Sequence, residues 1–548
     1  MKKVLILVCI FALILGVFAV SSAEVKYGGT LKVSGGVGAG VFNPFVSATA
    51  ESITSSIYEG LFYINKLNGK VTPLLGTSYE WRNNNLDLAV TIRKEVEWSD
   101  GISFTPKDVV FTFNYVKKYP GLDISGVWTP ISCLQSVEAE GDTVVFKFSK
   151  QNTPVLASIS AIPIVPEHIW SKIEDPTKFE NKEPVGTGPL LFKDISQSAG
   201  VLTAVKNPNF WMKGRPYIDG LKIVKALGNV TAVMMLLKDE VDWAYLYIPS
   251  VKETWNDENP ETNKSWWPVV NANVLYLNTQ KYPFTIPEFR KALAMAIDKE
   301  ALELKAYFGI GGVANPTGII PTQEEEWLDP SLKSVMYTYS PQKAQELLAS
   351  IGFEKNSSGD LTYPGGKVLP TFKILVGSGW TDYITMAQII SENFKELGIN
   401  TAIDQEQWGA YISSLMTGTY DTAICWETGD GSTPYYLYFN EFNPAFSATK
   451  IGEKASSDYS RYTNPLITSA LQVFAQTSDL RLQKQATYTI ERIVLDDVPF
   501  VPLTNRTNFM NYSEKNFVGW PSDSDPYTSG EGVNQAGGEM VVLNVHLK

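Results

Sequence analysis

The segment Thr371–Gly398, TFKILVGSGWTDYITMAQIISENFKELG, gives the clearest indication of the fold. Residues Thr371–Val376 have the composition of a strand. Ile384–Leu397 has the apolar spacing of a helix, and Gly398 is a residue type that commonly ends one. A strand, a helix and a following strand at this spacing indicate a parallel sheet, so we predict an α/β fold.

Two further helices are expected upstream of this unit. Pro341–Ile351 begins after Ser340, a good N-cap, and is followed by Gly352. The other is Glu288–Leu304, whose apolar residues recur on one helical face: Phe289, Leu293, Ala296, Ile297 and Ala301.

The pattern of the N-terminal half is different and predicts mainly short strands and loops. The alternation in Thr72–Lys94 is typical of a half-buried strand, and Thr105-Pro106 is typical of the start of a helix. Glu51–Phe62 has helical apolar spacing, and the alternating end of the chain, Met540–Leu547, is expected to be a strand. Shorter strands are expected at Gly29–Val33, Val144–Phe148 and Leu221–Val224.

The first 23 residues have the pattern of a secretory signal peptide. Lys2 and Lys3 precede the uncharged apolar run Val4–Val20, and Ser21-Ser22-Ala23 provides small residues before a cut at Glu24. A retained membrane anchor is the alternative, but the run is at the short limit for spanning a bilayer. We therefore expect an exported protein, periplasmic or extracellular.

Composition narrows the class of function. The chain has 548 residues, enough for two large lobes, and its formal net charge is −12. An acidic chain with no basic cluster repels phosphate backbones, so no nucleic-acid partner is expected. Cys133 and Cys425, which remain after signal removal, are far apart and indicate no disulfide framework.

The chain lacks most signatures of catalysis. Only two histidines occur, His168 and His546, and neither lies in a catalytic motif. No metal-binding, phosphate-loop or nucleophile-elbow motif is present, so we expect no catalytic residue, no metal and no cofactor. A glycosidase, which needs only two carboxylates, stays open at this stage.

Trp426–Phe439, WETGDGSTPYYLYF, has the composition of a binding segment. Aromatic faces stack on the apolar faces of a ligand, and a nearby carboxylate accepts hydrogen bonds from hydroxyls or an ammonium. These are the interactions that hold a polar small molecule.

Several motifs resemble those of the family 5 extracellular solute-binding proteins, which are the peptide and oligosaccharide receptors of ABC importers. They are GGTLKV at 28–33, YEGLFYIN at 58–65, TPLLGTSYEW at 72–81, WSDGISFTPKDVVFTFN at 98–114, GTGP at 186–189, NPNFW at 207–211, RPYID at 215–219 and FRKALAMAID at 289–298. They follow the order of the family from the mature start to Asp298.

The resemblance implies a two-lobed periplasmic-binding-protein (venus-flytrap) fold with an extra domain inserted in the first lobe. The expected division is a signal peptide at 1–23, a lobe 1 core of 24–45, 185–273 and 505–548, an inserted domain at 46–184 and lobe 2 at 274–504. Two crossing strands would join the lobes, with Val274–Asn278 as one hinge candidate. A ligand would be enclosed between the lobes.

The resemblance also suggests site residues. Trp426 matches a family tryptophan, and Trp408, in QEQWGAY, resembles one that lines the pocket. Asp430 keeps the family spacing to Pro434, where peptide receptors place an acid against the peptide ammonium, but one extra residue separates it from Trp426.

Two features favour sugar as the ligand. The segments TPYYLYF and VGWPSDSDPY (518–527) resemble the oligosaccharide branch, and the chain is rich in Trp and Tyr, whose rings stack on pyranoses. Core packing is the alternative role for each aromatic residue. Further stacking platforms are predicted at Trp380, Trp267 and Tyr245, and further hydrogen-bonding groups at Glu427, Asn278 and Asn43.

The resulting expectation is a monomeric receptor that captures an oligosaccharide and delivers it to the membrane permease of an ABC importer. The ligand would be β-linked, such as a cello-, manno-, xylo- or laminari-oligosaccharide. An oligopeptide receptor of the same family is the alternative, and a secreted glycosidase is a third possibility from a different class.

Overall fold

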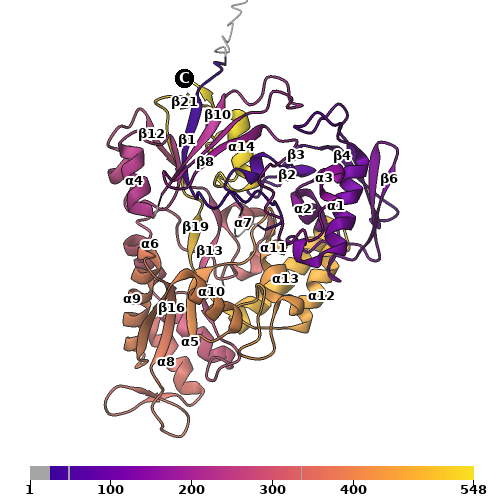
Figure 1. The fold of residues 1–548 in the computed structure, drawn as a ribbon. Helices are drawn as coiled ribbons and strands as arrows, with labels where there is room; N and C mark the ends of the chain where they lie inside the picture. The colour runs from indigo at the N-terminus through magenta and orange to yellow at the C-terminus, as the bar shows by residue number, and fades with distance from the viewer. Residues whose placement is uncertain (1–24, 47–49, 227, 335) are drawn as a thin grey trace, which may run out of the picture.

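The structure is a computed structural model that describes residues 25–46, 50–226, 228–334 and 336–548. The expected signal segment lies outside these residues. The chain forms two lobes, one above the other in Figure 1, and it crosses between them beside the ends of the strands β13 (Val269–Leu277) and β19 (Phe500–Thr507). Among the described residues no helix is long and apolar enough to cross a membrane.

Lobe 1 is built on a seven-stranded mixed sheet. Its central strand, β1 (Thr30–Gly35), runs parallel to both neighbours, β10 and β11. The strand order is β12 (Asn263–Trp266), β20 (Met510–Ser513), β11 (Trp243–Tyr245), β1, β10 (Gly220–Lys225), β9 (Val201–Lys206) and β8 (Leu190–Ser196). Strands from both ends of the chain therefore share one sheet.

Two helices and a small strand pair complete this part of lobe 1. Helix α4 (Asn229–Leu237) packs against β11, and α14 (Ala536–Asn544) packs against the 3₁₀ turn η1 (Thr54–Ser56). Strands β21 (Phe517–Val518) and β22 (His546–Leu547) pair at the C-terminus. A π-helical turn, η3 (Lys252–Asn256), precedes β12.

The remainder of lobe 1, on the right of Figure 1, is an antiparallel sheet with helices on one side. Helix α1 (Pro106–Lys118) has Thr105 as its N-cap and Pro106 as its first residue, as predicted, and a capping box joins Thr105 to Asp108. The sheet order is β4 (Gly76–Arg82), β5 (Asp87–Ile92), β7 (Thr143–Phe148) and β6 (Leu134–Glu140). The other elements are β2 (Phe62–Ile64), β3 (Val71–Pro73), η2 (Pro120–Leu122), α2 (Val155–Ala161) and α3 (Glu167–Trp170).

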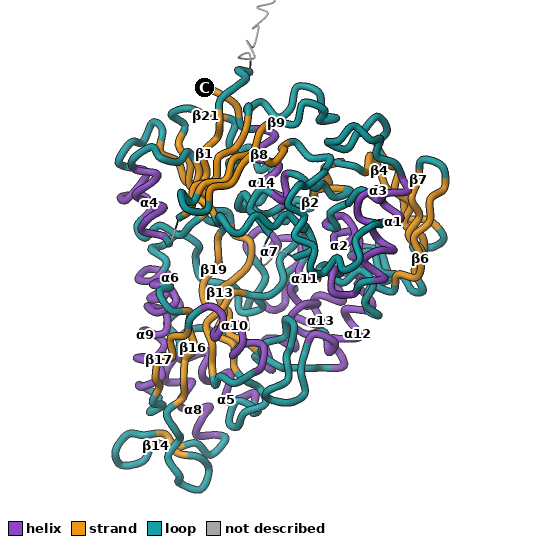
Figure 2. Tube along the Cα trace, in the orientation of Figure 1, coloured by secondary structure: helices purple, strands orange, loops and turns teal. Residues whose placement is uncertain are grey.

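Lobe 2 is a five-stranded sheet covered by helices on both faces (Figure 2). Its order is β17 (Thr401–Glu406), β16 (Phe372–Gly377), β18 (Thr422–Trp426), β13 (Val269–Leu277) and β19 (Phe500–Thr507). Strands β16, β17 and β18 are parallel, which confirms the parallel sheet predicted from Thr371–Gly398. One apolar core covers each face of this sheet.

The helices and short elements of lobe 2 have the following bounds: α5 (Pro287–Ala296), α6 (Lys299–Ala306), α7 (Pro321–Trp327), η4 (Pro330–Leu332), α8 (Pro341–Ser350), β14 (Glu354–Lys355), β15 (Leu361–Thr362), α9 (Thr381–Glu396), α10 (Trp408–Thr417), α11 (Pro434–Phe442), η5 (Pro444–Phe446), α12 (Pro465–Ala475) and α13 (Leu480–Asp497).

The chain crosses between the lobes at two adjacent points. β13 and β19 pair antiparallel, with Val269 opposite Thr507, and the Asn508 amide donates to the Pro268 carbonyl oxygen at 3.0 Å. The hinge candidate Val274–Asn278 was wrong, because β13 continues through Leu277 inside the lobe 2 sheet. The crossings lie instead at Trp267-Pro268 and Asn508-Phe509, and "lobe 2" below means residues 269–507.

Three local expectations were wrong for identifiable reasons. The predicted helix Glu288–Leu304 is split into α5 and α6, because the Asp298 carboxylate accepts a hydrogen bond from the Ala301 amide and starts a new helix. The predicted strand Met540–Leu547 is mostly α14, whose apolar run is buried on all sides and so gives no helical periodicity. Glu51–Phe62 forms only η1, and Gly60 packs directly against the Ser160 carbonyl.

Candidate functional site

Three tryptophans form an aromatic platform on lobe 2. Trp380 directly precedes α9, Trp408 begins α10, and Trp426 ends β18. Each residue follows or ends one of the parallel strands β16, β17 and β18, and the carboxyl ends of parallel strands meet at one edge of a sheet. The sheet therefore gathers side chains from three separate sequence segments.

The rings of this platform touch one another. Trp408 and Trp426 are nearly parallel, with ring centroids 6.3 Å apart, and the Trp380 centroid lies 5.8 Å and 5.9 Å from theirs. Trp408 is 56% exposed, whereas Trp380 and Trp426 are half-buried. A large apolar ring left this exposed on a folded domain suits the face of a bound molecule.

Arg506 lies beside the platform, near the end of β19. Its guanidinium carbon is 5.4 Å from the Trp426 ring centroid and 5.8 Å from that of Phe509, so it makes cation–π contacts with both. Burial opposes its charge, but the nearby Tyr245, Tyr383 and Tyr307 side chains and the Asp430 carboxylate outweigh this effect and raise the pKa of Arg506.

Lobe 1 contributes two aromatic residues near the crossings. Tyr245 ends β11, and its hydroxyl donates to Asn508 Oδ1 at 2.8 Å. Burial raises the pKa of Tyr245, and the charge of Arg506 partly offsets that rise. Trp267 donates from its indole nitrogen to Asn511 Oδ1 at 3.0 Å and packs edge-on against Phe509. Both rings are half-buried, and their polar atoms already have partners.

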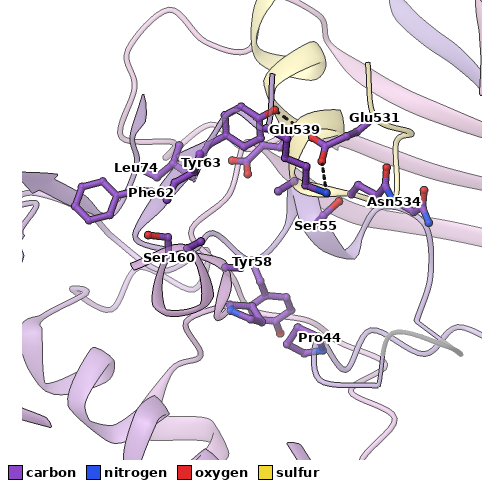
Figure 3. A pocket seen from close by; sticks show the side chains of 18 of the residues that line it. Pro44, Ser55, Tyr58, Phe62, Tyr63, Leu74, Ser160, Glu531, Asn534 and Glu539 are labelled. Carbon is purple, nitrogen blue, oxygen red and sulfur yellow. Dashed lines mark hydrogen bonds and ion pairs between the residues drawn. The ribbon is translucent and has the colours of Figure 1, made fainter. Parts of the chain in front are cut away.

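A cavity of about 570 Å³ lies between the two lobes. This volume is typical of a small-molecule site. Lobe 1 lines it from β2, α2 and the 531–539 segment, and lobe 2 lines it with Asp430–Ser432 and Tyr436. Figure 3 shows Glu531 and Glu539 beside Tyr63 on one wall, with Tyr58 and Pro44 farther along.

An ion-pair triad closes this cavity between the lobes. Lys66 Nζ lies 2.9 Å from an Asp430 carboxylate oxygen and 3.2 Å from one of Glu531, and the Tyr63 hydroxyl donates to Glu531 at 3.1 Å. Burial disfavours the Lys66 ammonium, but Asp430 and Glu531 outweigh it and raise the Lys66 pKa. Because Asp430 belongs to lobe 2 and the other residues to lobe 1, the triad joins the lobes. We call this region the ionic cavity.

Glu539, on the same cavity wall, is a buried carboxyl without a partner on one oxygen. It is 2% exposed, and Oε1 has no hydrogen-bond partner among the described residues. Burial, followed by repulsion from Glu59, raises the pKa of Glu539. Burial therefore favours the protonated form of Glu539.

The geometry is that of a binding site, and comparison with known proteins agrees. The family description "Bacterial extracellular solute-binding proteins, family 5 Middle" matches residues 70–447, which is more than half of the chain. The chain belongs to this family. Its two-lobed α/β fold is the family fold, and it is the substrate-binding receptor of an ABC importer, not an enzyme.

Individual relatives of this family 5 protein agree over nearly the whole chain. A periplasmic oligopeptide-binding protein of an oligopeptide ABC transporter from Thermotoga maritima, solved with bound mannohexaose, is 29% identical over 95% of this chain and 98% of that one, with a TM-score of 0.81. The oligopeptide-binding protein AppA of Bacillus subtilis is 25% identical over 90% of this chain and 89% of its own length. Heme-binding protein A of Haemophilus influenzae is 25% identical and covers 89% of both.

The structure brings together some of the residues predicted from the sequence. Trp380, Trp408 and Trp426 share the platform, and Asp430 lines the ionic cavity nearby. Tyr245 lies near Arg506, at the crossings. The structure shows that these residues lie close together, and their contact with a ligand is still a prediction.

Two predicted hydrogen-bonding residues were wrong. Asn43 and Asn278 are fully buried and their amides are used by the backbone. The Asn43 amide donates to the carbonyls of residues 176 and 179, and its oxygen accepts from the amide of residue 45. Asn278 donates to the carbonyls of residues 418 and 420 and accepts from residue 280. Both asparagines stabilise loops and leave no atom for a ligand.

Glu427 is also turned inward rather than toward the cavity between the lobes. It is 2% exposed, and its Oε2 accepts from the Ala272 amide at 2.9 Å. Burial, then the nearby Glu441, raise the Glu427 pKa well above its ordinary value. Glu427 directly follows β18 and continues its pairing with β13 through Ala272, so its side chain points away from that of Trp426 and into the interior.

Sequence reasoning missed Arg506, Lys66 and Glu531. A weak signal existed for Arg506, since it is the single charge in the otherwise uncharged strand FVPLTNRT. Lys66 and Glu531 gave none, because they meet only through the tertiary fold.

Proposed function

We propose that this receptor binds an oligosaccharide between its lobes, with sugar rings stacked on the aromatic platform of Trp380, Trp408 and Trp426. The observation that carries the proposal is the pairing of Asp430 with Lys66 at 2.9 Å. Asp430 is the carboxylate that, by resemblance, would meet a peptide ammonium. A lysine ammonium of the protein already holds that position, so a ligand without an ammonium group is favoured.

Two further facts support a sugar. Exposed indole faces attract the apolar C–H face of a pyranose, and the cavity of about 570 Å³ between the lobes offers carboxylates, amides and hydroxyls for sugar hydroxyls. The relative from Thermotoga maritima, 29% identical, was solved with mannohexaose bound.

Calorimetry of the full chain tests the proposal. Cello-, manno-, xylo- and laminari-oligosaccharides of two to six units would be titrated alongside di- to pentapeptides. We expect binding of at least one saccharide series in the micromolar range or tighter and no peptide response. Silence across the saccharides with a clear peptide response would overturn it.

An oligopeptide receptor is the second candidate, because relatives are named for peptide binding and Asp430 keeps 38% side-chain exposure. In that case Lys66 would have to release Asp430 when a peptide enters. Asp430→Asn would then abolish peptide affinity, since the ammonium loses its charged partner. Under the sugar proposal the same substitution lowers saccharide affinity only modestly.

The cellular setting proposed from the sequence completes this function. The chain would be exported by its first 23 residues, act as a monomer outside the cytoplasm, and deliver its ligand to a membrane permease. N-terminal sequencing of the secreted protein and light scattering at working concentration check the first two points. An uncleaved N-terminus or a stable dimer would contradict them.

A further inference from the structure

Arg506 is the one arginine in the described chain whose guanidinium has no carboxylate, carbonyl or amide acceptor and no ion pair; its hydrogen-bonding neighbour is the hydroxyl of Tyr245. The sequence has eight arginines, and the other seven are all partnered. Buried Arg290 and Arg461, for example, each donate to several backbone carbonyls. Each of the remaining five arginines has a carboxylate, a backbone carbonyl or a side-chain amide as its partner. These five are Arg82, Arg93, Arg215, Arg481 and Arg492.

The position of Arg506 makes this shortage of acceptors significant. The residue is half-buried and fixed on β19, opposite Asn271 of β13, between the platform and the crossings. A guanidinium withdrawn from water without acceptors is costly, because up to five N–H donors lose their water partners. The contacts to Trp426 and Phe509 compensate for charge but accept no hydrogen bond in the plane of the guanidinium.

The two nearest acids do not fill this role. Asp430 is held by Lys66 at 2.9 Å. Asp382 lies in the first turn of α9 and is more than 4 Å from Arg506. Burial raises the pKa of Asp382. The backbone amides of the same turn and the charge of Arg506 only partly offset that rise. The hydroxyl of Tyr245 donates its hydrogen to Asn508, and its oxygen is the single acceptor among the described residues for the several N–H groups of Arg506. The planar fork of Arg506 is therefore available to an incoming group.

We propose that Arg506 binds a carboxylate of the ligand, so that the preferred oligosaccharide carries a uronic-acid unit on or beside the platform. A guanidinium matches a carboxylate with two parallel N–H···O bonds, a geometry that no neutral sugar hydroxyl reproduces. The inference rests on the proposed saccharide function. A peptide C-terminus has the same carboxylate chemistry and is separated from it by the experiment.

The test compares matched ligands by calorimetry on the full chain. Cellobiose is paired with cellobiouronic acid, and xylotriose with its glucuronic-acid-substituted form; trigalacturonate and a tripeptide with a free C-terminus complete the set. We expect each acidic saccharide to bind at least about tenfold more tightly than its neutral partner. The preference should shrink as salt rises from 20 to 500 mM.

Substitutions at Arg506 locate the effect. Arg506→Gln should reduce acidic-saccharide affinity about 10- to 100-fold and change neutral-saccharide affinity about threefold or less. Arg506→Lys keeps the charge but loses the fork and should fall between. Arg82→Gln, at an exposed arginine paired with Glu80 on β4, is the matched control and should change neither affinity.

Each result supports or overturns the inference. Equal binding of neutral and acidic saccharides, or an equal loss of both in Arg506→Gln, overturns it and leaves the saccharide function standing. Binding of the tripeptide with silence of all saccharides overturns both. If Arg506→Gln unfolds, Arg506→Lys and the salt dependence of the unmodified protein decide the question, and a preference unaffected by either overturns the inference.

Discussion

The aromatic platform and the ionic cavity lie side by side but are built on opposite principles. The platform gathers three rings at the ends of neighbouring parallel strands within lobe 2, and it leaves apolar surface exposed. The ionic cavity pairs Lys66 of lobe 1 with Asp430 of lobe 2, and its charges satisfy one another without a ligand. The comparison teaches that affinity should depend mainly on the platform, whereas contact between the lobes and the exclusion of cationic ligands should depend on the cavity.

The largest effect on affinity is expected from a substitution that disrupts the platform. Trp426→Leu keeps apolar volume but removes the flat ring, and buried aromatic anchors account for much of the energy of an interface. We expect saccharide affinity to fall about 30- to 300-fold by calorimetry.

The control for this change is Trp128→Leu, which alters a tryptophan that also lies under a cation, Lys117 at 4.1 Å, but far from the platform. It should leave affinity unchanged. Equal affinities for the Trp426→Leu variant and the unmodified protein would contradict a stacking role.

The next largest effect is expected from a substitution that removes the cation of the ionic cavity. Lys66→Met leaves Glu531, whose side chain is 5% exposed, without its cation. We expect the free energy of unfolding to fall by about 1–3 kcal/mol in urea titrations, because a buried carboxylate loses its partner. Asp430 also becomes free, so affinity for cationic ligands should rise while neutral saccharide affinity changes little.

Lys94→Met provides the comparison, since Lys94 pairs with Asp142 at 2.5 Å on the open surface. No measurable loss of stability is expected there. A loss of stability in the Lys94 variant as large as that in the Lys66 variant would show that the ion pairs of the cavity stabilise the fold no more than a surface ion pair does.

A smaller effect follows from proton binding. Burial raises the pKa of Glu539 in the cavity wall, and that of Glu491 in α13 to about 8 from an ordinary value of 4.5. The folded state keeps these protons at pH values where the unfolded chain has lost them. The free energy of unfolding should therefore fall as pH rises from about 4.5 to about 8.

Glu539→Gln separates the contribution of the cavity from the rest. It should make this decline smaller, as measured by urea titrations at pH 5 and pH 8. Trp408→Ala, on the platform, should leave the slope as it is. A slope unchanged by Glu539→Gln would show that the carboxyl ionises normally.

The smallest effect concerns the crossings. Tyr245→Phe removes the hydroxyl that donates to Asn508 at 2.8 Å and keeps the ring. We expect a loss of about 1 kcal/mol in stability and less than about a threefold change in saccharide affinity. A tenfold or larger loss of affinity would mean that the hydroxyl contacts the ligand directly.

The features that the sequence predicted are those controlled by local order. The parallel pairing of β16 and β17 was confirmed, and the three tryptophans follow strands whose ends a parallel sheet must bring together. Where burial is complete, as in α14, periodicity disappears and the prediction of a strand was wrong.

The site predictions failed for residue types that can either stabilise a local turn or contact a ligand. Asn43 and Asn278 were chosen as hydrogen-bonding groups, but each accepts from the amide two residues later, the turn role typical of asparagine. Lys66 and Glu531, by contrast, are 465 positions apart, so no sequence pattern links them.

The adjacent crossings have a consequence for how this protein can be divided. Because Val269 and Thr507 are paired neighbours, the segment between them leaves lobe 1 and returns to it at nearly the same place. Segments with adjacent ends and a core of their own are the ones that tolerate excision and transplantation. Residues 269–507 carry the whole platform together with Arg506, so half of the recognition surface could be produced as a separate, movable module.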